Sequence, residues 1–110
     1  MEFTARTEGD YEVLVFTGQI DFNTSATVRD AIIVHLDAGR QVLVDLSGVT
    51  YIDSSTIASL VQGLQHGKGK GLGVGLVGVR DSVLKVLKLS SLDKIFPMHD
   101  SVAEAVAAGS

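Results

Sequence analysis

The chain has 110 residues, of which 45% are apolar and 20% charged, a composition typical of one globular domain with a single hydrophobic core. Its formal net charge of −4 argues against non-specific nucleic-acid binding, and the absence of cysteine excludes disulfides, thiolate catalysis and cysteine-ligated zinc. The chain has no apolar run long enough to span a membrane and no secretory signal, so we expect a cytoplasmic protein without direct membrane insertion.

The first half of the chain predicts a hairpin, a helix and a central strand. Residues 3–7 and 12–17 are short β-prone runs separated by a loop that contains glycine, as in a β-hairpin. A polar cluster around Thr24 suits the start of a helix, which we expect over residues 26–38. Residues 42–46 form a mostly apolar run, as expected of a strand in the middle of a sheet.

The second half alternates helices with strands, and glycine, proline and capping residues mark the boundaries. We expect, in chain order, a helix over residues 54–65, a flexible connection over 67–71, a strand over 72–77, a helix over 83–89 and a short strand at 95–96. Ser101 and Glu104 form a capping box for a small last helix that ends at Gly109.

The order of these elements, ββαβαβαβα, predicts the fold class. Strands joined through a helix run parallel, while the first hairpin adds an antiparallel strand at one edge. The sequence therefore predicts a single α/β domain, with a small mixed sheet of four to five strands and about four helices packed on it.

Three residues at the start of the second helix are the best candidates for a functional site. Asp53, Ser54 and Ser55 are of the types that cap helix N-termini, and they precede an apolar stripe at helical spacing. This stripe consists of Ile57, Leu60, Val61 and Leu64, and we assign it to the core. The opposite face would then be exposed and available to a partner, and it consists of Thr56, Ser59, Gln62 and Gly63.

Other patterns that could carry catalysis lack the context that they require. The glycines at 73, 75 and 78 match a dinucleotide fingerprint but lie within the expected strand rather than at the start of a helix. The three histidines are widely separated, and no base other than the acidic Asp53 is placed to activate Ser54. We therefore expect no enzymatic activity, no cofactor and no metal site.

Three segments of the chain resemble segments of one protein family, and they occur in the same order as in that family. The stretch VLVDLSGVTYIDSS at residues 42–55 is similar to the central motif of the STAS domain, as found in bacterial anti-sigma factor antagonists. Residues 18–21 (GQID) resemble the Gly-x-Leu-Asp segment of that family, and residues 83–96 resemble its third helix and the segment before its last strand. The resemblance covers nearly the whole chain and implies one STAS domain over residues 1–110.

The resemblance implies an interaction protein in a partner-switching pathway. In such antagonists the serine directly after the motif aspartate, here Ser54, is phosphorylated by a serine kinase that is also the anti-sigma factor. The unphosphorylated form binds this kinase, phosphorylation releases it, and a PP2C-type phosphatase resets the switch. Asp21 would contribute to the docking surface, and Asp53 would cap the helix or orient Ser54. Ser55 and Thr56 remain alternative phosphate acceptors.

Two further expectations accompany this interpretation. The family's Gly-Leu-Gly is replaced here by residues 56–58 (TIA), a difference that bears on the choice of partner more than on the fold. We expect a monomer. The alternative function within the same fold is that of a STAS accessory subunit that docks on a lipid-transport ABC system.

Overall fold

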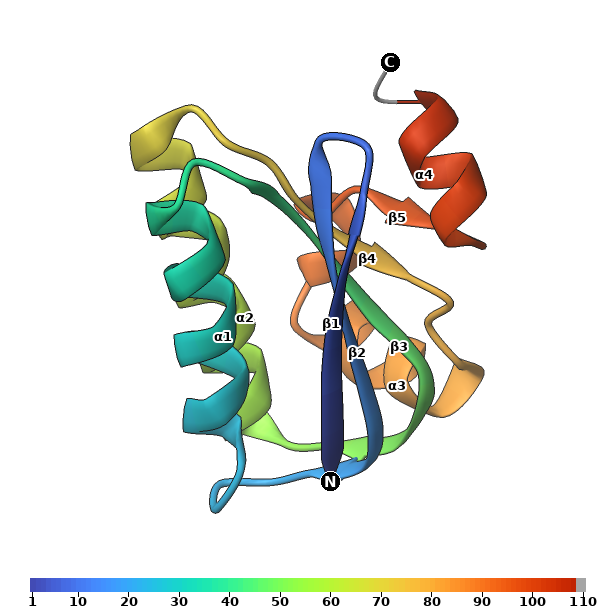
Figure 1. Ribbon diagram of the computed structural model, residues 1–110. Coiled ribbons are helices and arrows are strands. Elements are labelled where there is room, and N and C mark those ends of the chain that lie inside the picture. The colour runs from blue at the N-terminus through green and yellow to red at the C-terminus, as the bar shows by residue number, and fades with distance from the viewer. Residues whose placement is uncertain (109–110) are drawn as a thin grey trace.

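The structure is a computed structural model that describes residues 1–108 and has the expected order of strands and helices (Figure 1). A short 3-10 helix, η1, is added before the last strand. The elements are β1 (Glu2–Glu8), β2 (Tyr11–Ile20), α1 (Ser25–Asp37), β3 (Gln41–Ile52), α2 (Ser54–Lys70), β4 (Val74–Val77), α3 (Asp81–Leu89), η1 (Leu92–Lys94), β5 (Met98–His99) and α4 (Val102–Ala108). The expected end of the last helix at Gly109 lies outside the described residues.

The described part of the chain has five strands, which form one mixed sheet in the order β1-β2-β3-β4-β5. β1 and β2 form the antiparallel hairpin, and β2, β3, β4 and β5 pair with parallel neighbours. This confirms the α/β fold that the sequence predicts, because each helix between two strands returns the chain to the same end of the sheet.

The two faces of the sheet are covered unequally. The main core lies between one face and helices α1, α2 and α3, and its fully buried members include Phe16, Ile32, Leu60 and Leu87. A smaller cluster lies between the other face and α4, and it includes Val13, Leu43 and Ala105. Figure 1 shows α1 and α2 side by side against the sheet and α4 on the opposite side.

Several boundaries predicted from the sequence were wrong. The strand expected over residues 42–46 continues to Ile52, because the polar residues after Leu46 still pair with β2 through two shifts of register. The expected flexible connection over 67–71 is mostly helix, and α2 ends only where Gly71 adopts a left-handed conformation (φ 71°). There the N–H of Leu72 donates to the carbonyl of Gly67 (2.8 Å), a helix-ending bond that satisfies one of the last carbonyls.

The last strand was also predicted in the wrong place. Residues 95–96 follow directly on η1, since the N–H groups of Ile95 and Phe96 both donate to the carbonyl of Leu92 (3.1 Å each). Strand β5 forms only after Pro97, at Met98–His99, where it pairs with the end of β4. Proline at the first position before a strand is tolerated because it costs no bond of the ladder there.

Candidate functional site at the start of helix α2

The site lies where two neighbouring parallel strands end together. Ile20, the last residue of β2, pairs with Ile52, the last residue of β3. The two residues that follow, Asp21 and Asp53, therefore both lie at the carboxyl ends of the parallel strands β2 and β3. The sequence placed both in the docking surface, and the parallel register is what brings them to one end of the domain.

Asp53 caps helix α2. Its backbone is extended, and its Oδ1 accepts hydrogen bonds from the N–H groups of Ser55 (3.0 Å) and Thr56 (3.2 Å). These N–H groups belong to the first helical turn and have no partner within the helix, so the carboxylate satisfies them and complements the positive end of the helix dipole. Of the two roles considered from the sequence, capping is the one visible in the hydrogen bonds.

The three hydroxyl groups after Asp53 differ in their surroundings. The Ser55 hydroxyl donates to Asp53 Oδ1 at 2.5 Å, and the fully buried Thr56 hydroxyl donates to the carbonyl of Ile20 at 2.7 Å. Ser54 is exposed, and its hydroxyl makes no hydrogen bond within residues 1–108. Ser54 is therefore the hydroxyl that a modifying enzyme or a partner can reach.

Thr56 has a structural role that the sequence did not suggest. Its bond to Ile20 ties the start of α2 to the end of β2, across 36 positions of the chain. Buried carbonyl groups need such partners. Thr56 was expected to be exposed, and its complete burial contradicts this; its role as an alternative phosphate acceptor stays a prediction, against which the burial argues.

The pKa of Asp53 is lowered from its ordinary value. The main cause is the hydrogen bond from the Ser55 hydroxyl, and the backbone bonds from Thr56 and Ser55 act in the same direction, while partial desolvation opposes them. Each of these bonds stabilises the charged carboxylate. Asp53 is therefore an ionised cap at neutral pH, and it engages the hydroxyl of Ser55 rather than that of Ser54.

The loop after β2 presents an aromatic residue beside this site. Asp21 Oδ1 accepts from the N–H of Asn23 (2.9 Å), and the Asp21 carbonyl accepts from the N–H groups of Thr24 (3.0 Å) and Ser25 (2.8 Å). This compact turn holds Phe22 between its bonded residues, with 75% of the residue exposed. Phe22 was not among the site residues predicted from the sequence, although a large apolar residue in a polar loop was the signal available.

The exposed face of α2 was assigned wrongly from the sequence. Thr56, Ser59 and Gly63 are buried, and only Gln62 of the expected partner face is exposed. The surface of the helix instead presents Ser54, Ala58, Gln62 and Gln65, with Ile57 and Val61 half-buried beside them.

Small side chains on α2 explain this reversal. A Cβ atom built on Gly63 would lie 2.8 Å from Cγ2 of Ile32 on α1, so the two helices meet at a distance that only glycine allows. Ser59, Gly63 and Gly67 recur every fourth residue, which puts them on one helix face. That spacing was visible in the sequence, but a periodicity based on apolar residues counts small residues as surface.

Neither a metal-binding group nor a membrane-spanning helix is found in the described part of the chain. No three or more His, Asp or Glu residues within 1–108 are grouped so that they could hold a metal ion. None of the helices there has the length and apolar character that crossing a bilayer requires. The exposed Ser54 hydroxyl and the Asp53 carboxylate lie at the start of α2, and the exposed Phe22 lies in the loop after β2.

Comparisons with known proteins agree with this architecture. The family model of the STAS domain matches residues 2–105. A STAS-domain containing protein of Pseudomonas aeruginosa (strain UCBPP-PA14) is 30% identical over 98 residues, which cover 87% of this chain and 97% of that protein. Among solved structures, a putative anti-sigma factor antagonist from Thermotoga maritima has a TM-score of 0.90 at 24% identity, covering 96% of this chain and 92% of the other.

A further structural similarity is to SpoIIAA, an anti-sigma factor antagonist whose structure is known in two forms. The unphosphorylated form has a TM-score of 0.74 at 14% identity and covers 97% of this chain and 96% of its own. The phosphorylated form, described as a Bacillus cell fate determinant, has a TM-score of 0.77 at 16% identity, covering 99% and 100%. At such identities the likeness to the solved structures establishes the fold alone.

Proposed function

The chain belongs to the STAS domain family, and on this premise we propose that it is an anti-sigma factor antagonist controlled by phosphorylation of Ser54. The observation that carries the proposal is the contrast among the three hydroxyls. Ser54 is exposed at the first position of α2, whereas Ser55 and Thr56 are bonded to Asp53 and Ile20. Phosphorylation at Ser54 would leave the capping bonds and the buried bond intact.

A phosphate on Ser54 would change the surface rather than the fold. It adds a charge of about −1.5 to −2 at neutral pH. The N–H groups of Ser55 and Thr56 already donate to Asp53, so the phosphate has to project toward solvent or toward a partner. There it adds to the charge of the neighbouring Asp53 carboxylate, and a partner that closes over this helix start would meet both charges.

We propose that the partner is an anti-sigma factor with serine kinase activity, and that a PP2C-type phosphatase restores the binding form. Asp21 and Asp53 carry negative charge at this end of the sheet, and Phe22 projects from the turn beside them. A complementary partner would offer basic groups around an apolar pocket for the Phe22 ring, because exposed aromatic residues commonly anchor interfaces. Gln62 and the rest of the exposed face of α2 extend this surface along the helix.

The test is a pull-down from native lysate of the source cell with wild type, Ser54→Ala and Ser54→Asp, followed by mass spectrometry of the bound proteins and of the phosphorylation site. We expect a serine kinase to be retained by wild type and Ser54→Ala and lost with Ser54→Asp, with phosphate found on Ser54. The matched control is Ser55→Ala, which removes the neighbouring hydroxyl and should leave retention and phosphorylation unchanged.

A second variant tests the surface independently of the modification. Phe22→Ala should weaken binding to the captured partner at least tenfold, which corresponds to about 1.4 kcal/mol. Retention of an ABC transporter by all three Ser54 forms would instead replace the proposal with the accessory-subunit function. Phosphate on Ser55 alone would refute the assignment of Ser54.

A further inference from the structure

Strand β1 forms an open edge of the sheet. Within residues 1–108 it is the first strand in the sheet order and pairs only with β2, and all seven of its residues are exposed. It contains neither proline nor lysine, and its pairing with β2 runs from Glu2 to Glu8 without a bulge. Proteins usually protect such edges with one of these devices or with charged side chains, so the charges of Glu2, Arg6 and Glu8 determine what this edge can pair with. Figure 1 shows β1 at the front of the molecule with no other element in front of it.

The geometry of the hairpin determines which backbone groups of β1 are available. Its loop has two residues, and the positive φ of Gly9 (60°) at the first loop position is typical of a tight hairpin turn in which the flanking pair, Glu8 and Tyr11, exchanges both backbone bonds. Bonded and non-bonded pairs then alternate along the strand. The N–H and carbonyl groups that point away from the sheet are therefore those of Phe3, Ala5 and Thr7.

Side-chain distances agree with this alternation. Opposed side chains approach each other more closely at non-bonded pairs. At two such pairs, the Thr7 hydroxyl donates to Glu12 at 3.0 Å, and the ring of Phe3 stacks on that of Phe16 with centroids 4.8 Å apart.

Charge then selects one way for two such edges to pair. In an antiparallel pairing with Ala5 on the two-fold axis, Glu2 would face Glu8 of the other copy, which is repulsive. With Thr4 on the axis, Glu2 faces Arg6 and Arg6 faces Glu2, so both opposed charge pairs are attractive. Both arrangements join the outward-pointing backbone groups to each other, so the charges decide between them.

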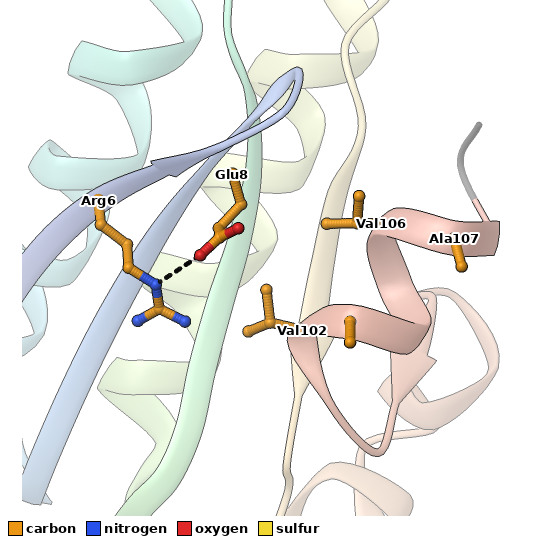
Figure 2. A pocket seen from close by; sticks show the side chains of 6 residues that line it. Arg6, Glu8, Val102, Val106 and Ala107 are labelled. Carbon is orange, nitrogen blue, oxygen red and sulfur yellow. Dashed lines mark hydrogen bonds and ion pairs between the residues drawn. The ribbon is translucent and has the colours of Figure 1, made fainter.

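We propose that β1 pairs with β1 of a second copy of this chain, antiparallel, with Thr4 on the two-fold axis. The pairing joins the two five-stranded sheets into one. Arg6 already donates to Glu8 of its own strand at 3.2 Å (Figure 2), so in the dimer its guanidinium lies between that carboxylate and Glu2 of the other copy. We expected a monomer from the sequence; under this proposal the chain is instead a dimer at high protein concentration. The interface is small, so the dimer is weak, with a Kd between about 1 μM and 1 mM.

Disulfide crosslinking tests the register directly, because the natural chain has no cysteine. Opposed residues of a non-bonded pair have Cα atoms about 4.5 Å apart, within the range that a disulfide spans. Thr4→Cys should therefore oxidise to a covalent dimer much faster than Thr27→Cys, an exposed control on α1. Ala5→Cys reports the rejected register. The proposal is refuted if Thr4→Cys crosslinks no faster than Thr27→Cys, or more slowly than Ala5→Cys.

Sedimentation equilibrium of the cysteine-free chain tests the charge argument. Arg6→Glu should raise the dimer Kd at least tenfold, and the swapped pair Glu2→Arg with Arg6→Glu should restore it to within about threefold, because both opposed pairs are attractive again. Ala5→Pro removes an outward N–H while leaving the ladder to β2 intact, so it should abolish dimerisation without unfolding the domain. A wild-type chain that remains monomeric to about 1 mM would overturn the proposal.

Discussion

The buried glycine face of α2 can be tested by placing the same substitution at two positions of one helix. Gly63→Ala introduces a Cβ at 2.8 Å from Cγ2, 3.2 Å from Cδ1 and 3.3 Å from Cβ of Ile32. Gly69→Ala introduces a Cβ that, apart from its chain neighbours and the backbone of its own helix, meets no atom of residues 1–108 within 4 Å. Gly63 lies in the middle of α2 and Gly69 in its last turn, so the gain in helix propensity is at least as large at position 63, and a loss of stability there reports the contact with Ile32.

The magnitudes follow from these distances. Alanine in place of glycine in a helix contributes about 0.5–1 kcal/mol, so Gly69→Ala should stabilise the domain by that amount. At position 63 the added methyl meets a fully buried β-branched side chain that has little rotamer freedom in a helix. Overpacking of this kind costs about 1–3 kcal/mol, so Gly63→Ala should lie below Gly69→Ala by that amount.

The measurement is urea-induced unfolding followed by far-UV circular dichroism, because the chain has no tryptophan. In thermal unfolding followed by the same signal, the melting temperatures of the two variants should differ by about 4 °C for each kcal/mol of difference in stability. On an Ile32→Leu background, which removes the Cγ2 branch, the cost of Gly63→Ala should fall. Equal stability of the two glycine variants would show that Gly63 does not face α1, and would return the partner surface to the face first expected.

Two other substitutions test the hydrogen bonds at the site. Thr56→Val keeps the shape of the side chain but leaves the buried carbonyl of Ile20 without its donor, so the free energy of unfolding should fall by about 1–3 kcal/mol. Thr56→Ser keeps the hydroxyl and should keep that hydrogen bond. Equal losses of stability for the two variants in urea unfolding would contradict the role of the Thr56 hydroxyl as the donor to Ile20. Ser55→Ala removes the main cause of the lowered pKa of Asp53, so that pKa should rise toward its ordinary value in carboxyl NMR titrations. An aspartate whose pKa is lower in the folded than in the unfolded protein stabilises the fold at pH values above the unfolded-state pKa, and this stabilisation is lost as the pH falls through the folded-state pKa. Ser55→Ala raises the folded-state pKa of Asp53, so the acid-induced loss of stability should begin at higher pH.

The local sequence was sufficient for most of the secondary structure. The hairpin, the four helices and the parallel crossovers follow from turn residues, caps and apolar periodicity, and the structure has all of them. The predictions that were wrong concern where helices and strands begin and end; the glycines at 67–71, for example, were expected to end helix α2. Gly67 lies inside α2 because its missing side chain makes room for the carbonyl of Leu72 at the end of the helix, a reason that local propensity does not contain.

The functional residues divide along a similar line. The pattern of Asp53 and Ser54 before an apolar helix was enough to place a capped, exposed serine at a helix start. The parallel pairing of β2 and β3, which brings Asp21 and Phe22 beside it, depends on contacts between segments about thirty residues apart.

Hydrophobic periodicity and capping chemistry are local properties, so the sequence by itself determined the fold class, the helix start and the candidate hydroxyls. It could not determine which face of α2 is buried, because serine and glycine are buried there only by the close approach of α1. The burial of Thr56 likewise depends on an acceptor on another strand. Only the tertiary structure decided which of three adjacent hydroxyls remains exposed, since packing between distant segments selects the face that a helix presents to solvent.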